Sequence, residues 1–388
     1  MKILSIHNKY LNVGGEDISK ESEEAILKDK GISVDIYEEN NKRIKEIGYL
    51  NTAIRTIWSK ESYDNILQLI KKNNYDLIHV QNFFPLISPS IYYAAKKLNV
   101  PVVQTLRNYR LICPNGLLFT SNKICERCIN KIFPWPSIVY KCYRNNSIAT
   151  IPLALMLFFH NIMKTWKNKV DAFITLTNFE KNKYIEGGFP KDKIYVKPNF
   201  VYPDPGPGKG NGDYAIYVGS LTIEKGVRTL IEAWKLLKIK KTLKIIGTGP
   251  LKNYVINETK KNDNINYLGF KNVNEVYDLI GEAKFLIFPL EMFGTFGRVI
   301  IESFAKGTPV IVPFIGALAE LVNKNQTGLF YKKGNIKDLT SKIFWAFTHD
   351  KEIKEMRKKS RQEFEFKYTA EINFNMIVEI YNNIKTIK

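Results

Sequence analysis

Short apolar runs alternate with longer segments of helical periodicity along the whole chain. In the first half the runs are residues 2–7, 33–39, 76–82, 101–106, 172–177 and 194–199. In the second half they are 214–220, 242–249, 265–270, 285–290, 309–314 and 328–331. Continuous apolar runs separated by helices are typical of parallel sheets that are covered on both faces. The pattern predicts an α/β fold with two doubly wound, Rossmann-like domains.

A stretch rich in Pro and Gly, "NFVYPDPGPGKGNGD", separates the two halves and has the composition of a linker. We expect an N-terminal domain over residues 1–203 and a C-terminal domain over 204–364, facing each other across a cleft. Such sheets bind ligands beyond the carboxyl ends of their strands, where helices begin. The last segment, 365–388, has helical periodicity and is expected to pack back on the N-terminal domain.

A glycine loop in the C-terminal half, "EMFGTFGRVIIESFAKGTPVIV" (291–312), is a candidate anion site. Gly294 and Gly297 lie between an apolar run and a helix that we predict over 299–305. Free N–H groups at the start of that helix can bind a diphosphate. Glu302, one turn later, can accept hydrogen bonds from a ribose diol. The alternative is a surface ion pair between Arg298 and Glu302, which are four residues apart.

Three further strand-end loops point the same way. In "YVGSLTIEKG", Lys225 is predicted to stand at the start of another helix of the same sheet, where it can meet a phosphate. The loop "IIGTGPL" also follows an apolar run, and "NVGGED" follows the first run of the N-terminal half. The alternatives are an exposed lysine and plain turns.

The charge of the chain fits an anionic partner. The 388 residues carry a formal net charge of +20, and residues 104–200 alone hold 15 Lys or Arg against 5 Asp or Glu. Nucleic acid, a nucleotide or an acidic membrane surface would each suit this field. We find no zinc-finger, helix-turn-helix or aromatic RNA-binding pattern. The first strand is not followed by G-x-G-x-x-G, which argues against a nucleotide-dependent oxidoreductase.

No run of 18 or more apolar residues exists, and the start "MKILSIHNKYLN" has the pattern of a first strand rather than of a secretory signal. We therefore expect a cytoplasmic location.

Taken in order, these loops resemble those of the retaining glycosyltransferases of family four, which have the GT-B fold. The segments "GGED", "NFFPLISPS", "NYRLICPNG", "EGGFP", "VKPNF" and "TFGRVIIESFAKGTPVIV" are similar to the subgroup that builds capsule, O-antigen or exopolysaccharide. The resemblance implies a nucleotide-sugar donor of the UDP or GDP type and a glycan or lipid-linked acceptor. It also implies transfer without a metal, since a lysine and helix dipoles neutralise the leaving diphosphate. A peripheral position on the inner face of the cell membrane would suit such an acceptor.

The resemblance also implies roles for individual residues. Lys225 would bind the diphosphate and Glu302 the ribose, while backbone amides from Thr295 to Val299 would contact phosphate and sugar. The full donor-binding set is then Gly14, Gly15, Gly219, Ser220, Lys225, Gly247, Gly249, Phe270, Thr295, Phe296, Gly297, Arg298, Val299 and Glu302. The catalytic set is Arg107, Gly294 and Glu302.

At four positions the chain departs from the family pattern. Gly294 stands where the family has the first of two glutamates, and Glu291, three residues earlier, is a candidate replacement. Ser220 stands in place of an arginine, and Arg107 and Gln81 stand in place of histidines. We expect an altered donor specificity or a weakened turnover. A catalytically silent nucleotide-sugar-binding homologue remains the main alternative, and a basic nucleic-acid-binding protein the second.

All the cysteines fall within an insertion that we place at 107–165. Cys113, Cys125, Cys128 and Cys142 have the spacing C-x11-C-x2-C-x13-C, which predicts a structural zinc site. Unrelated reduced thiols are the first alternative, and disulfides the second. The segment after them, "IPLALMLFFHNIMKTWKNK", is too short to span a bilayer. It suits either a buried helix or a helix lying in a membrane interface.

Overall fold

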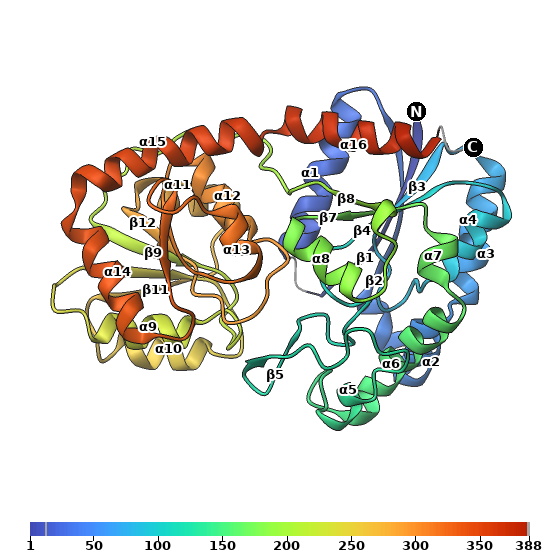
Figure 1. Cartoon of the computed structure of the whole chain (residues 1–388), viewed down its shortest axis with the longest axis horizontal. Coiled ribbons are helices and arrows are strands. Elements are labelled where there is room, and N and C mark those ends of the chain that lie inside the picture. Colours follow the sequence, from blue (N-terminus) through green and yellow to red (C-terminus); the bar gives the residue numbers. More distant parts are fainter. Residues whose placement is uncertain (12–13, 386–388) are drawn as a thin grey trace. The chain divides into compact units, whose positions relative to one another are not determined.

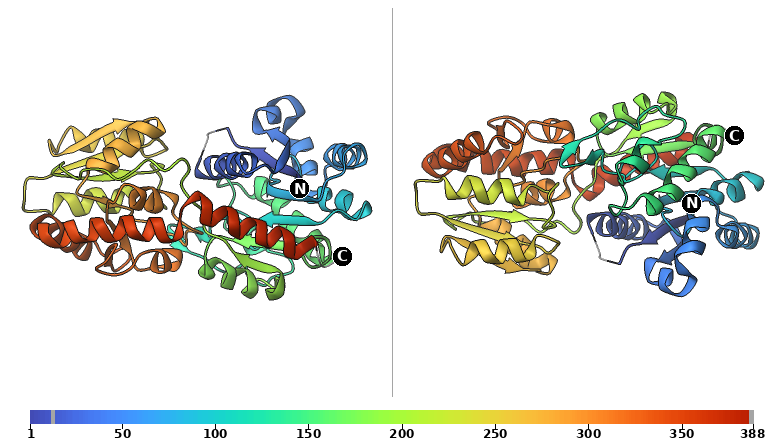
Figure 2. Two further views of the ribbon diagram at one scale, coloured as in Figure 1. Left: turned by 90° about the horizontal axis from the view of Figure 1, so that it is seen from above. Right: turned by 90° about the horizontal axis from the view of Figure 1, so that it is seen from below.

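The computed structural model describes residues 1–11 and 14–385, and the chain divides into two compact units. The first unit comprises residues 1–121, 125–199 and the end of the chain from residue 371. The second comprises 200–370 together with the short segment 122–124. Each unit holds one parallel six-stranded sheet with helices on both faces (Figures 1 and 2). The predicted α/β class with two Rossmann-like sheets is confirmed.

In the first unit the strand order is β2-β1-β3-β4-β7-β8. These strands are β1 (Lys2–Lys9), β2 (Ser33–Asn40), β3 (Leu77–Asn82), β4 (Val102–Thr105), β7 (Ala172–Thr175) and β8 (Ile194–Val196). The helices are α1 (Gly15–Asp29), α2 (Ile44–Ile57), α3 (Lys60–Lys72), α4 (Ser90–Lys97), α5 (Pro136–Val139), α6 (Ser147–Ile162), α7 (Thr165–Lys169), α8 (Asn178–Glu186) and α16 (Ala370–Lys385). Two short 3-10 helices span Asn41–Arg43 and Lys191–Lys193. Outside the two large sheets, β5 (Phe119–Thr120) pairs with β6 (Lys123–Ile124), the strand that falls in the segment assigned to the second unit.

In the second unit the strand order is β11-β10-β9-β12-β13-β14. These strands are β9 (Tyr214–Val218), β10 (Thr242–Ile246), β11 (Ile265–Gly269), β12 (Phe285–Ile287), β13 (Val310–Pro313) and β14 (Gly328–Tyr331). The helices are α9 (Val227–Lys235), α10 (Lys252–Thr259), α11 (Val273–Glu282), α12 (Arg298–Ala305), α13 (Gly316–Leu321), α14 (Ile336–Thr348) and α15 (Asp350–Lys367).

Each sheet is buried between helices by apolar side chains of its strands. In the second unit the central strands supply Ala215, Ile245 and Ile287, which pack against α9 and α14 in one core. In the first unit α16 contributes Ile377 and Tyr381 to the core that covers the sheet. All twelve predicted apolar runs form strands, since such runs are typical of strands that a parallel sheet buries on both faces, although β3 also buries the polar His79 and Gln81. No helix in the described part of the chain is both long enough and apolar enough to cross a bilayer.

Candidate active site

The topology of the second sheet determines which loops can form a ligand site. The chain runs outward from β9 to β11 and then returns to β12 on the other side of β9. In an open parallel sheet, the crevice at such a reversal lies beyond the carboxyl ends of the two strands that flank it. Those strands are β9, which leads to the Lys225 loop and α9, and β12, which leads to the Gly294 loop and α12.

The two loops are joined through their backbones. The N–H of Glu291 donates a hydrogen bond to the carbonyl of Glu224 over 2.9 Å. Gly226 has a φ of +74°, and a Cβ added to it would lie 1.7 Å from the carbonyl oxygen of Pro289. No other residue fits this contact without moving the backbone, so the Lys-Gly pair in the sequence has a structural cause.

Lys225 stands beside this junction. Its ammonium lies 5.7 Å from the centroid of the Phe288 ring. It has no ion pair or hydrogen bond to any residue that the structure describes, and its side chain is half-buried. Burial lowers the pKa of the ammonium, and the nearby Glu224 carboxylate opposes that shift. A half-buried cation without a carboxylate partner suits a bound anion such as a phosphate.

At the start of α12 the Arg298–Glu302 ion pair is present. The Nε of Arg298 donates to Glu302 Oε1 over 2.8 Å, and both side chains are mostly buried. The other carboxylate oxygen of Glu302 has no hydrogen bond among the described residues. The ion pair and a ligand-binding role are therefore compatible, because Arg298 uses only one of the two oxygens.

The loops that follow β10 and β11 lie at the same edge of the second sheet as the loop that follows β9. The loop after β10 passes so close to the loop after β9 that a Cβ on Gly247 would lie 1.9 Å from the carbonyl oxygen of Gly219. The N–H of Leu221, next to Ser220, donates to the carbonyl of Thr248, next to Gly249, over 2.9 Å. The Phe270 ring, just after β11, is 77 % exposed. The structure thus brings the loops after β9, β10 and β11 together.

Within the Gly294 loop, the structure limits which groups can face a ligand. The Phe296 side chain is buried and lies edge-on to Tyr368, with the ring centroids 6.2 Å apart, so only its backbone is available. Thr295 and Val299, on either side, are half-buried. The Glu291 carboxylate accepts a hydrogen bond from the Thr229 hydroxyl over 2.8 Å. This hydrogen bond engages one of the two carboxylate oxygens, as the Arg298 contact does for Glu302, so Glu291 remains a candidate for the role of the glutamate that Gly294 replaces.

Gly14 and Gly15 belong to the first unit, unlike the other predicted donor-binding residues. The N–H of Gly14 donates to Asp17 Oδ2 over 2.9 Å, and α1 begins at Gly15. A Cβ on Gly14 would meet no atom of the described residues within 4 Å, which leaves its backbone open to a ligand on that side. Burial alone would raise the pKa of Asp17, but hydrogen bonds from His7 and Gly14 hold it below its ordinary value.

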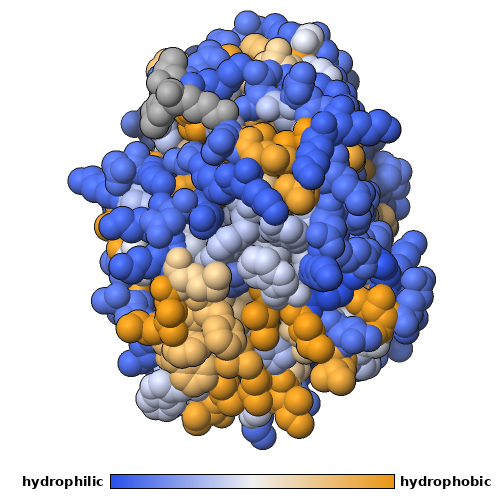
Figure 3. Space-filling view, turned by 90° about the vertical axis from the view of Figure 1, so that its right-hand side faces the viewer, coloured by the Kyte–Doolittle hydropathy of each residue, from blue (hydrophilic) through white to orange (hydrophobic). Residues whose placement is uncertain are grey.

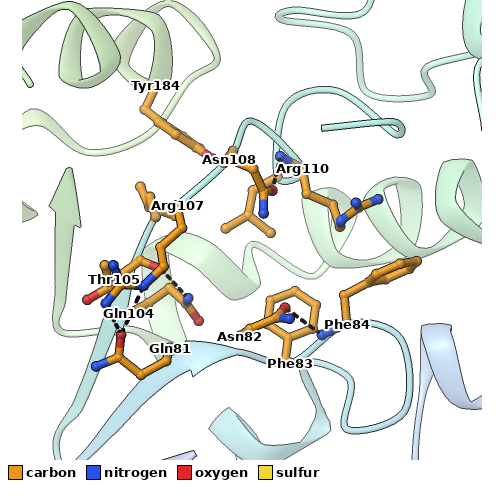
Figure 4. Close-up of a pocket in the computed structure, with 12 residues that line it drawn as sticks. Gln81, Asn82, Phe83, Phe84, Gln104, Thr105, Arg107, Asn108, Arg110 and Tyr184 are labelled. Atoms are coloured by element: carbon orange, nitrogen blue, oxygen red, sulfur yellow. Dashed lines mark hydrogen bonds between the residues drawn. The ribbon is translucent and has the colours of Figure 1, made fainter. Parts of the chain in front are cut away.

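Arg107 and Gln81, which the sequence presented as two separate departures, are hydrogen-bonded to each other. The Nη2 and Nε of Arg107 donate to Gln81 Oε1 over 2.6 and 3.2 Å (Figure 4). The Gln81 amide in turn donates to Glu23 Oε1 over 2.5 Å, and Glu23 pairs with Lys197 over 2.8 Å. Burial would raise the pKa of Glu23, but Lys197, His79 and Arg107 lower it to about 2.

A small pocket lies at the carboxyl ends of β3 and β4 in the first unit (Figure 4). Arg107, Asn108 and Arg110 line it, and Tyr184 borders it from α8. The Arg110 guanidinium lies 4.0 Å from the centroid of the Phe84 ring and donates to the carbonyl of Pro114 over 2.8 Å. The pocket is cationic and rich in hydrogen-bond donors, which suits a hydroxylated or anionic ligand.

Neither Glu23 nor Lys197 had a predicted role. They lie 174 residues apart in the sequence, and no local pattern links them.

The predicted zinc site is not supported. No group of three or more His, Cys, Asp or Glu in residues 1–11 and 14–385 is arranged to hold a metal ion, and the four cysteines are free thiols. The Cys113 thiol donates to Asn115 Oδ1 over 3.0 Å. Burial raises the pKa of Cys128 to about 12 and raises that of Cys113 and Cys142 as well.

Comparison with known proteins decides the family. The model of the "Glycosyl transferases group 1" matches residues 204–363, and that of "Glycosyltransferase Family 4" matches residues 30–204. The chain belongs to the family 4, group 1 glycosyltransferases. This glycosyltransferase is 26 % identical to an uncharacterized glycosyltransferase of Methanocaldococcus jannaschii, over 99 % of both chains. It is also 26 % identical to the capsular polysaccharide biosynthesis glycosyltransferase CapM of Staphylococcus aureus, over 44 % of this chain and 47 % of CapM.

Solved structures establish the fold of the glycosyltransferase. HepE of Anabaena in complex with UDP has a TM-score of 0.70 and 15 % identity, covering 99 % of this chain and 100 % of HepE. Sucrose-phosphate synthase of Thermosynechococcus elongatus has a TM-score of 0.71 and 14 % identity, covering 100 % of both chains. The predicted GT-B fold is thereby confirmed.

Proposed function

We propose that this glycosyltransferase moves a sugar from a nucleoside-diphosphate sugar to a glycan or lipid-linked glycan, with retention of the anomeric configuration. The observation that carries the proposal is the Lys225 ammonium, which has no ion pair among the described residues and stands at the reversal point of the second sheet. A diphosphate is the anion that a lysine and a helix N-terminus together suit best. The structure of HepE with UDP-glucose supports a nucleotide-sugar donor.

In this proposal the residues of the second unit hold the donor. Lys225 binds the diphosphate, Glu302 binds the ribose through its second carboxylate oxygen, and the first turn of α12 faces the phosphates. The bond between the sugar C1 and the phosphate oxygen breaks while the acceptor hydroxyl oxygen bonds to C1 on the same face. The leaving phosphate takes the hydroxyl proton. Lys225 and the dipole of α12 stabilise the charge that develops on the diphosphate, so transfer needs no metal.

The first unit supplies the acceptor side. Arg107 is held in the pocket wall by Gln81 and by Asn199 Oδ1, at 3.0 Å from Arg107 Nη1. The name of CapM, and a 25 % identical protein in the cps region of Klebsiella pneumoniae, support a role in surface polysaccharide synthesis. An acceptor linked to lipid would bring the enzyme to the inner face of the cell membrane.

The test is a transfer assay with a panel of UDP and GDP sugars, run with a chelator present. We expect transfer to a glycan acceptor, and the newly formed linkage should have the same anomeric configuration as the donor by proton NMR. A product of opposite configuration, or activity lost on chelation, would contradict the retaining, metal-independent mechanism. Donor binding without any turnover would instead identify a catalytically silent homologue.

A further inference from the structure

Exposed apolar side chains concentrate on one part of the first unit. Figure 3 shows them gathered at the lower part of the face, where Figure 1 places α2, α5 and α6. Three of them, Tyr49, Leu50 and Ile148, are 78, 77 and 78 % exposed. We call this area the apolar surface and define it by Tyr49, Leu50, Ile54, Ile132, Trp135, Val139, Tyr140, Ile148, Ile151, Phe159, Ile162 and Met163.

The apolar surface is continuous because α2 and α5 both pack against α6. The inner face of α6 is buried through Leu153, Met156 and Leu157. Its outer face, at Ile148 and Ile162, is apolar too, although a helix on the surface of a soluble domain normally has a polar outer face. These outer side chains are not buried in the core, so their apolar character indicates that this face binds a partner.

The charge along the α5 and α6 part of the apolar surface has one sign, whereas α2 carries one exposed carboxylate, Glu46. Residues 127–170 contain seven Lys or Arg and no Asp or Glu. None of these seven cations has an ion pair with any residue that the structure describes. Lys131, Lys141, Arg144 and Lys164 are all exposed. An apolar area bordered mainly by cations fits a partner that offers hydrocarbon together with negative charge.

We propose that the apolar surface docks on an anionic phospholipid bilayer. The side chains of α2 and α6 enter the headgroup and acyl boundary, and the surrounding cations bind lipid phosphates. A second copy of this chain fits less well, because a two-fold contact would bring the same cations face to face. The described helices do not cross a bilayer, so the docking is peripheral.

The position of the apolar surface extends the proposed function. The chain leaves the pocket at Arg107 and Arg110 and continues through the cysteine segment into α5 and α6. Tyr143, on the way, stacks edge-on against Phe84 of the pocket, with ring centroids 5.9 Å apart. If the enzyme uses a lipid-linked acceptor, as proposed above, the bilayer would deliver that acceptor next to this pocket.

The test is flotation of the whole protein with vesicles, in the absence of any nucleotide. The vesicles contain either phosphatidylcholine alone or equal parts of phosphatidylcholine and phosphatidylglycerol. We expect the protein to float with the anionic vesicles and to do so less with the neutral ones. The triple variant Tyr49→Ser, Leu50→Ser, Ile148→Ser should lower the partition coefficient by about tenfold or more. Lys141→Gln with Arg144→Gln should weaken binding only to the anionic vesicles.

Matched controls come from the second unit. Phe366→Ser removes a 76 % exposed ring, and Lys354→Gln with Lys359→Gln removes two exposed cations; neither should change flotation. Wild-type protein that floats with neither vesicle, or a triple variant that floats like wild type, would overturn the proposal. So would a wild-type dimer, seen by light scattering, that the triple variant converts to a monomer. UDP affinity should stay unchanged in the triple variant, which separates this proposal from the donor site.

Discussion

Replacing Gly226 with alanine tests whether the Lys225 loop and the Gly294 loop depend on their close contact. At this position alanine would have to adopt a φ of +74° and place its Cβ 1.7 Å from the carbonyl oxygen of Pro289. The left-handed conformation alone costs a non-glycine residue about 1–2 kcal/mol. The clash adds to this, because the Cβ and the oxygen must separate to an ordinary contact of 3.4 Å or more.

The cost of the clash depends on which atoms must move to relieve it. The groups that would collide are backbone atoms, which cannot rotate away as a side chain can. Separating the loops breaks the hydrogen bond from the Glu291 N–H to the Glu224 carbonyl, worth about 1 kcal/mol. Backbone shifts forced by overpacking cost about 1–3 kcal/mol more. We expect Gly226→Ala to destabilise the protein by about 3–6 kcal/mol in total.

Gly269→Ala is the matched control. Gly269 lies in the same unit with a φ of +72°, but an added Cβ would meet nothing within 4 Å. The control should therefore cost only the backbone term of about 1–2 kcal/mol. Urea denaturation of both variants, followed by circular dichroism, measures the difference. If the two variants lose the same stability, the loops are not in the contact described here and the argument for Gly226 is wrong.

Three further predictions concern the departures from the family pattern and the buried histidine. Gln81→Ala and Arg107→Ala should each lower the free energy of unfolding by about 1–3 kcal/mol in urea denaturation. The double variant should lose less than the sum of the two, since both substitutions remove the same hydrogen-bonded pair. If the two losses of stability add up, the pair is not coupled. Burial lowers the pKa of His79 to about 4, so His79 stays neutral in the folded chain at pH values where it takes a proton when unfolded. The stability that His79 contributes is complete above pH 6.5 and is lost as pH falls toward 4. The free energy of unfolding should therefore fall by about 2 kcal/mol between pH 7 and pH 5, and His79→Gln should remove this loss. The same dependence of unfolding free energy on pH in that variant would contradict this. Gly294→Glu should fold normally, because its Cβ would press only on the flexible end of Leu290 at 2.8 Å, and should impair the native donor in a panel of nucleotide sugars; higher turnover with that donor would show a deficient site rather than an altered specificity.

Most of the fold could be predicted from the sequence because strands buried on both faces leave a continuous apolar run. The same signal predicts some strands to be longer than they are. We predicted a strand over 285–290, but β12 ends at Ile287. Phe288 and Leu290 are apolar because they are buried in the loop that passes Gly226, and burial alone does not distinguish a loop from a strand.

The candidate site was predictable where one loop carries its own signal, as at Lys225 with Gly226. Contacts between distant segments were not. Gln81 lies in β3 and Arg107 follows the end of the neighbouring strand β4, and only the pairing of these strands shows that two departures form one hydrogen-bonded pair. The cysteine spacing pointed to zinc, because spacing along the chain does not reveal where the thiols point. The segment 151–169 was weighed as a buried or an interfacial helix, whereas α6 has one buried and one exposed apolar face.

Calorimetric titration of a nucleoside diphosphate tests the central claim most directly. UDP and GDP are each titrated into the wild type, Lys225→Ala, Glu302→Ala and the control Lys354→Ala, which removes an exposed lysine of α15. We predict binding of one nucleotide to the wild type and to the control. Lys225→Ala should weaken it by about 1.5–3 kcal/mol, the worth of a hydrogen bond to a charged group. An affinity that is unchanged in both Lys225→Ala and Glu302→Ala would show that the donor does not bind at these loops.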